Sequence, residues 1–228
     1  MTISKKTSRS NAAPLAANIP LPQCVGRPGS DKRQIAAQVI AAPELLPQLV
    51  AGLESEQAAI KYGCEKVLML LSEQAPALLY PRMDYFVTLL DSQNNFLKWG
   101  AIHIIAHLST VDTENRFDAI IDRYFAPLAG PVMITAGNLA KAVPVIAAAK
   151  PHLTARLVRE LLKVEHAQSQ TDECRHVALG HVILAFDHVF GPLPVPAAVI
   201  ALVKRQLASP RPATRRKAEK FVRKHRLL

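Results

Sequence analysis

Residues 97–101, with the sequence LKWGA, repeat a pattern that first occurs 37 residues earlier in the stretch 60–64, IKYGC. Both stretches place an aliphatic residue first, a lysine second, an aromatic residue third and a small residue fifth. Leu68 and Ile105 follow at the same distance from the start of their own stretch. A pattern that recurs at an interval of this length is typical of proteins built from stacked helical units.

Three further stretches fit the same frame, and the four successive offsets are 37, 37, 40 and 40 residues. The shared frame is an apolar residue, then Lys or Arg, then a small residue and an aliphatic residue that lie on one face of a helix. Each unit leaves a second apolar face that only the next unit can cover, which favours stacking. The additional copies are 134–138 (ITAGN, without the basic residue), 174–178 (CRHVA) and 214–218 (TRRKA).

The periodicity of the apolar residues predicts an all-helical chain, since no stretch shows the alternation typical of a β-strand. Pro43 and Pro81 suit the first turns of helices, and Asn94 and Thr171 suit N-caps. Pro144 lies inside a predicted helix and is expected to kink or shorten it. The predicted helices span 31–41, 43–54, 57–74, 81–91, 94–109, 113–128, 131–148, 151–164, 172–189, 195–208 and 212–226.

The formal net charge of +10 is concentrated at the two ends of the chain. Residues 1–30 carry four basic residues and no acid, and residues 204–228 carry ten basic residues and one acid, whereas residues 31–203 have a net charge of −3. Residues 1–30 also lack helical periodicity, so we expect a disordered basic tail there and one repeat domain over 31–228. The uneven distribution argues against treating the whole chain as a basic, nucleic-acid-binding protein.

Three features of the composition predict a cytoplasmic chain. Cys24, Cys64 and Cys174 are too scattered to suggest a disulfide framework. No apolar run reaches the roughly 18 residues of a membrane-spanning helix. The N-terminal segment has no continuous apolar stretch that would serve as a secretory signal.

The repeated frame resembles the second helix of HEAT-like repeats, in the armadillo-type superfamily, over roughly residues 40–226. This resemblance implies a right-handed α-solenoid of about five helical hairpins, in which equivalent positions align along one surface. It also implies that an acid in the turn of each repeat pairs with the basic residue of the frame. Acids lie seven residues before Lys61 and Lys98, and another lies near Arg175.

The basic residues of the frame allow two interpretations. They can form a stripe that binds an anionic partner, or they can be held in structural ion pairs with the turn acids. The basic C-terminal segment raises the same choice between an anion-binding surface and a polar cap of the last repeat. The candidate residues for binding an anionic partner are Lys61, Lys98, Arg175, Arg215, Arg216, Lys220 and Arg223.

Tyr62 and Trp99 each follow a lysine of the frame directly. An aromatic ring beside a cation can stack on a nucleobase or hold a flexible strand. The same rings can also simply pack between neighbouring repeats. Both interpretations remain open at the level of the sequence.

The histidines and cysteines provide no convincing catalytic or metal site. His103 and His107 have the i, i+4 spacing of a helical metal pair but no assured third ligand. Cys174 and His176 are two residues apart and would point away from each other on a helix. There is neither a glycine-rich phosphate loop nor a Gly-x-Ser-x-Gly elbow. We therefore expect no catalytic residue, no metal and no cofactor.

The resemblance and the missing catalytic motifs together predict a non-catalytic HEAT-like scaffold that binds a protein or another extended partner. The alternative is a nucleic-acid-binding protein related in architecture to the alkylation-repair DNA glycosylases. The resemblance to those enzymes implies a basic concave face with tryptophans and an essential aspartate. Here Trp99 is the only tryptophan, and no glycosylase motif matches residue by residue.

Overall fold

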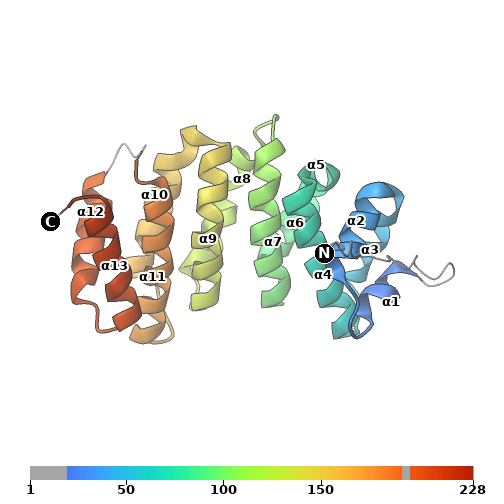
Figure 1. Ribbon diagram of the computed structural model, residues 1–228, viewed down its shortest axis with the longest axis horizontal. Helices are drawn as coiled ribbons and strands as arrows, with labels where there is room; N and C mark the ends of the chain where they lie inside the picture. The colour runs from blue at the N-terminus through green and yellow to red at the C-terminus, as the bar shows by residue number, and fades with distance from the viewer. Residues whose placement is uncertain (1–19, 192–195, 228) are drawn as a thin grey trace, which may run out of the picture. The chain divides into compact units, whose positions relative to one another are not determined.

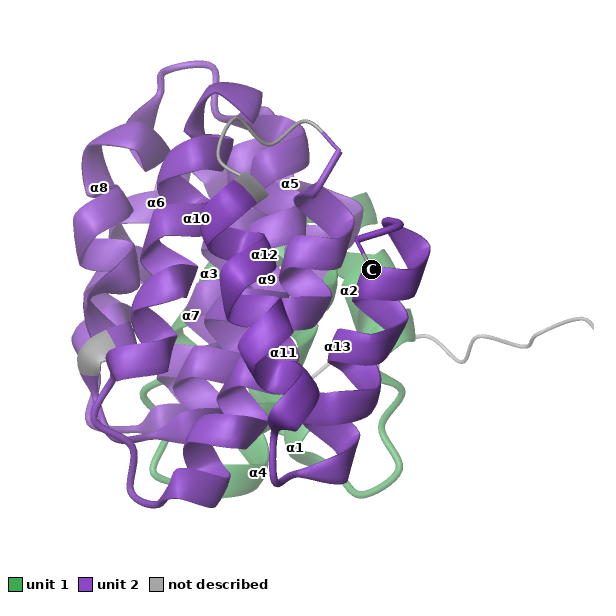
Figure 2. Ribbon diagram, turned by 90° about the vertical axis from the view of Figure 1, so that its left-hand side faces the viewer, with its two compact units in different colours: residues 1–70 green, residues 71–228 purple. Residues whose placement is uncertain are grey.

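The computed structural model describes residues 20–191 and 196–227, and this part of the chain is helical with no strand (Figure 1). The chain divides into two compact units, residues 1–70 and residues 71–228 (Figure 2). This division does not coincide with the predicted boundary at residue 30.

The first unit contains helix α1 (Leu21–Gly26), which was not predicted from the sequence. Leu21 and Val25 are buried, and the Leu21 amide donates a hydrogen bond of 3.1 Å to Gln48 Oε1. The prediction of a disordered tail over residues 1–30 is therefore wrong for residues 21–26. A helix of this length is too short to show periodicity, and its stability comes from packing. Residues 1–19 lie outside the described residues.

The rest of the first unit packs helices against the start of α4. Gly63 on α4 faces α1 so closely that a Cβ atom there would lie 2.6 Å from Val25 Cγ1. The small residues of the sequence frame at 63 and 64 therefore reflect close helix packing in this unit. Its helices are α2 (Lys32–Ala41), the 3₁₀ turn Pro43–Leu45, α3 (Leu46–Gly52) and the first part of α4 (Ala58–Gln74).

The second unit is a succession of longer and shorter helices. The longer helices contact each other in chain order: α7 packs on α9, α9 on α11 and α11 on α13 (Figure 1). The helices are α5 (Pro76–Leu79), α6 (Met83–Thr88), α7 (Asn95–Leu108), α8 (Arg116–Phe125), α9 (Met133–Ala149), α10 (Thr154–Leu162), α11 (Asp172–Val189), α12 (Pro196–Arg205) and α13 (Pro212–Lys224). Short 3₁₀ turns extend several of them, at Tyr80–Arg82, Leu89–Asp91, Ser109–Val111, Ala126–Ala129, Pro151–Leu153, Lys163–His166 and Gln206–Ala208.

The predicted helix starts agree with the structure where capping chemistry is strong. The Asn94 side chain accepts hydrogen bonds from the backbone amides of residues 96 and 97, and Thr171 accepts one from the Cys174 amide. Pro144 does not shorten its helix, since α9 continues to Ala149. A proline removes only one helical hydrogen bond, and the buried side chains of Val143 and Ile146 hold the helix on both sides of it.

Side-chain bonds in the second unit join residues that are about one sequence repeat apart. Three ion pairs connect successive short helices or their turns, at separations of 32, 34 and 40 residues. Hydrogen bonds between α7 and α9 have separations of 35 and 36 residues. Each helical unit is therefore tied to the next at nearly the interval of the sequence pattern. The ion pairs are Asp91–Arg123, Asp122–Arg156 and Glu165–Arg205.

Candidate partner-binding face

One face of the second unit carries a stripe of side chains from each of its long helices, and we call it the α7–α13 face. On α7 the stripe is Phe96, Trp99 and His103, spaced three and four residues apart. On α9 it is Ile134, Asn138 and Lys141, spaced four and three residues apart. On α11 the stripe continues with His181, Leu184 and His188, and α13 contributes Lys217.

At the junction of α7 and α9, two side-chain bonds hold the helices in register. The indole N–H of Trp99 donates to Thr135 Oγ1 at 2.9 Å, and His103 Nε2 lies 3.1 Å from Asn138 Oδ1. Phe96 packs edge-on against the Trp99 ring, with 5.3 Å between the ring centroids. Trp99 is therefore fixed between the helices, while Phe96 keeps 57% of its surface exposed.

Between α9 and α11 the same face contains a pocket of about 250 Å³. Lys141 and His181 line it from the two helices, together with the apolar side chains of Pro144 and Leu184. Gly137 makes room for the histidine, because a Cβ at this position would lie 3.3 Å from His181 Cδ2. The remaining lining residues are Ala140, Ala185 and His188.

Positive charge accumulates around His181. Burial lowers the pKa of His181, and the nearby cations Lys217, Lys141 and Arg211 lower it further. Burial also lowers the pKa of Lys217, and Arg211 and Lys141 add to this effect. Within the described part of the chain, neither Lys141 nor Lys217 forms an ion pair, whereas Arg211 bonds Glu173 at 2.7 Å. Like charges therefore meet at this point with little compensation.

Lys217 reaches this cluster by lying along α11. A Cβ atom on Gly180 would be 3.2 Å from Lys217 Nζ and 2.9 Å from Thr214 Oγ1. The absence of a side chain at Gly180 therefore leaves the space that the lysine occupies. The same threonine donates a hydrogen bond of 2.6 Å to the His176 carbonyl, which fixes α13 against α11.

The predicted basic and aromatic residues do not all share this face. Lys61 and Tyr62 belong to the first unit, where Lys61 is half-buried and Tyr62 is exposed. Lys98 is half-buried on α7, and the acid that was expected to pair with it, Asp91, instead binds Arg123 at 2.5 Å. The prediction of that pair is wrong, because the turn directs the acid toward α8.

The basic residues nearer the C-terminus have different roles. Arg175 forms the expected ion pair with Asp172, at 3.2 Å. Arg215 donates a hydrogen bond of 3.3 Å to the Ser209 carbonyl and so closes the turn before α13. Three other predicted residues are exposed on α13, and none of them forms an ion pair with a described acid. They are Arg216, Lys220 and Arg223.

Lys141, His181 and Lys217 were not among the site residues predicted from the sequence. A signal was present, because Lys141 and His181 both lie seven residues after the start of their copy of the frame. In the other three copies this position is apolar and buried in the described structure. Those residues are Val67, Ile104 and Phe221. A polar residue at a position that is otherwise part of the core marks the two copies that form the pocket.

The histidines of α7 do not form a metal site. His103 bonds α9, whereas His107 Nδ1 lies 2.9 Å from Ser72 Oγ. Among the described residues there is no group of three or more histidine, cysteine or acidic side chains that could hold a metal ion.

In the described part of the chain no single helix is long and apolar enough to cross a membrane. By length and composition alone, one sharply bent pair of helices meets that requirement, Lys32–Ala41 with Pro43–Gly52.

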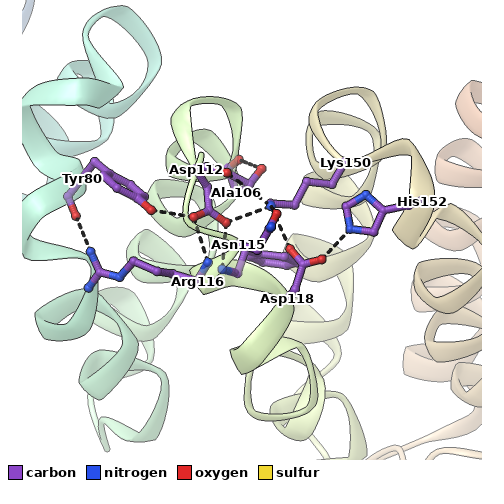
Figure 3. A network of polar contacts seen from close by, with 10 residues as sticks. Tyr80, Ala106, Asp112, Asn115, Arg116, Asp118, Lys150 and His152 are labelled. Atoms are coloured by element: carbon purple, nitrogen blue, oxygen red, sulfur yellow. Dashed lines mark hydrogen bonds and ion pairs between the residues drawn. The ribbon is translucent and has the colours of Figure 1, made fainter.

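A buried polar network lies away from this face, in the turns that connect the helices (Figure 3). Lys150 Nζ lies 3.0 Å from Asp112 Oδ2 and 2.7 Å from Asp118 Oδ2. The side chains of Lys150 and Asp112 are 4% and 0% exposed. Asp112 also accepts hydrogen bonds from the Tyr80 hydroxyl and from two backbone amides at the start of α8. Since solvent and ligands do not reach this pair, we assign the network to stability.

The two carboxylates of this network are held in the ionised form. Burial alone would raise the pKa of Asp112, but its hydrogen bonds, including those from Tyr80 and Lys150, outweigh burial and lower it. Burial acts in the same direction on Asp118, and contacts with His152 and Lys150 again lower the pKa overall.

Comparison with known proteins identified no matching family model and no matching curated protein. Among solved structures, the chain is similar to an engineered protein whose crystal structure was determined by a structural genomics consortium. The two share 15% sequence identity, with a TM-score of 0.45, over 91% of this chain and 87% of the other.

Proposed function

We propose that this chain is a non-catalytic scaffold of HEAT-like repeats whose α7–α13 face holds an extended peptide segment of a protein partner. The observation that carries this proposal is that one large apolar side chain is exposed on each of three long helices that pack in succession, and we call the three side chains the exposed row. Phe96, Ile134 and Leu184 have 57%, 47% and 40% of their surface exposed. Exposed apolar groups gathered on one face mark interaction surfaces more often than isolated ones do.

The HEAT-like arrangement is supported by the spacing of the bonds between helical units. The separations of 32 to 40 residues resemble the offsets of the sequence frame. The successive contacts of α7, α9, α11 and α13 are also those expected when each hairpin covers the apolar face of the one before it.

An extended segment suits the geometry of the exposed row. Packed helices lie about 8–10 Å apart, and Leu184 lies about 15 Å farther along its helix than the position that matches Ile134, so the three side chains span roughly 25 Å. An extended peptide covers that length with about eight residues, at about 3.3 Å each. Each large apolar side chain that becomes fully buried contributes about 1.5–3 kcal/mol, and the partly exposed ones contribute less.

A peptide-display selection against the full chain tests this proposal. Peptides recovered from the selection are synthesised with a fluorophore, and their affinities are measured by anisotropy. We expect Phe96→Ser and Leu184→Ser each to weaken binding at least tenfold. Ile40→Ser is the matched control, because Ile40 is 37% exposed on α2 of the first unit. Circular dichroism checks that each variant is folded. Selected peptides that bind both face variants as tightly as the unaltered chain would refute the proposal.

Nucleic-acid binding is the second candidate, and the exposed basic surface of α13 favours it. Arg216, Lys220 and Arg223 are exposed there, within a C-terminal segment of ten basic residues and one acid. Binding through such cations weakens steeply with salt. Anisotropy titrations test this candidate, with single-stranded and duplex DNA at low and at physiological salt. The absence of binding at low salt would refute it. The placement of Trp99, with its indole N–H on Thr135 and its ring against Phe96, argues against a base-stacking role.

A further inference from the structure

We propose that Lys141, His181 and Lys217 form a subsite that recognises the carboxylate of an acidic residue in the bound peptide. The neighbouring Leu184 and Pro144 would then hold an apolar side chain next to that carboxylate. This inference rests on the proposed function and specifies the partner as an acidic peptide with an adjacent apolar residue.

Three helices converge to build this subsite. Lys141 of α9 and His181 of α11 line the same pocket. Lys217 of α13 lies over Gly180, the residue directly before His181. All three side chains are nitrogen donors when charged, and a carboxylate can accept from several donors at once.

The surrounding charges leave the subsite positive. His188 also lines the pocket from α11, and Arg211 approaches from the start of α13. The acids nearby have other partners: Glu173 bonds Arg211 at 2.7 Å, and Asp187 bonds Lys224 at 2.9 Å and His225 at 2.8 Å. Repulsion among the cations is relieved when an anion binds, and this relief favours a negatively charged ligand.

The shape of the subsite favours a peptide over a nucleic acid. Its walls are largely apolar, and its volume of about 250 Å³ suits a side chain better than a continuous sugar–phosphate backbone. Proteins that hold single strands use grooves of cations along the backbone together with aromatic stacking platforms. Here the large apolar residue exposed beside the cations is the aliphatic Leu184.

The direct test uses two capped dipeptides, acetyl-Leu-Glu-amide and acetyl-Leu-Gln-amide, which have nearly the same shape and differ in charge. Each is titrated into the full chain, with the ring signals of His181 followed by NMR. We expect the glutamate probe to bind at least tenfold more tightly than the glutamine probe. Lys141→Met and Lys217→Met should each abolish this preference. Lys204→Met, an exposed lysine of α12, serves as the control and should retain it.

Three outcomes would overturn the inference. The first is equal binding of the two dipeptides, and the second is a preference that survives in both lysine variants. The third is tighter binding of a ten-nucleotide oligothymidine than of the glutamate probe at physiological salt, if that oligothymidine binding is lost in Lys141→Met. The dipeptides are too short to span the exposed row, so their binding and that of the selected peptides are separate results. If the dipeptides show no preference but selected peptides still bind the face, only the subsite is refuted. If the dipeptides show the preference but no selected peptide depends on the face, only the proposed function is refuted.

Discussion

Replacing Lys150 with methionine tests the buried polar network most directly. Methionine keeps the length and the apolar stem of lysine but removes the ammonium group that lies 3.0 Å from Asp112 and 2.7 Å from Asp118. The Asp112 carboxylate would then be buried without a cation. Removing one partner of a buried ion pair costs about 3–5 kcal/mol, because the remaining charge is uncompensated. The Asp118 side chain is 26% exposed and keeps His152 as a partner, so we expect a loss near the lower end, about 3 kcal/mol.

The loss is measured by urea unfolding of the full chain, followed by far-ultraviolet circular dichroism, and by the shift in Tm. For a chain of this size, 1 kcal/mol corresponds to roughly 2–4 °C, so Tm should fall by at least about 6 °C. Arg123→Met is the matched control, because it removes an exposed ion pair with Asp91 and should cost less than about 1 kcal/mol. A Lys150→Met loss no larger than that of the control would refute the assignment of this network to stability.

Three further predictions follow from particular contacts. Gly63→Ala should destabilise the chain by about 1–3 kcal/mol in urea unfolding, because its Cβ would meet α1 at 2.6 Å, while Gly191→Ala, with nothing within 4 Å, should be neutral. Because the pKa values of Asp112 and Asp118 are lowered in the folded chain, their stabilising contribution is present above about pH 4 and is lost as the pH falls through the folded-state values. The free energy of unfolding should therefore decrease from about pH 5 to about pH 2, and it should decrease less in Lys150→Met. Because the pKa of His181 is lowered, its ring gains charge only below about pH 6.5, so affinity for the glutamate dipeptide should rise as the pH falls below that value. An unchanged rise in His181→Gln would contradict this role.

The sequence alone determined the positions of most helices. Capping by Asn94 and Thr171 and the spacing of apolar residues act over only a few positions along the chain, so they can be read without knowing the fold. The interval of the sequence pattern can be found in the same way, and the separations of the side-chain bonds lie close to it. The short helix α1 was missed because its stability comes from burying Leu21 and Val25 against other helices.

Only the tertiary structure decided which charges are paired and which side chains come together on one face. Asp91 lies seven residues before Lys98, yet it bonds Arg123 of α8. Lys141, His181 and Lys217 are far apart in the sequence and come together because α9, α11 and α13 pack in succession. A local pattern shows that a residue is basic, but its electrostatic role depends on the atoms that a neighbouring unit places within a few ångströms of it.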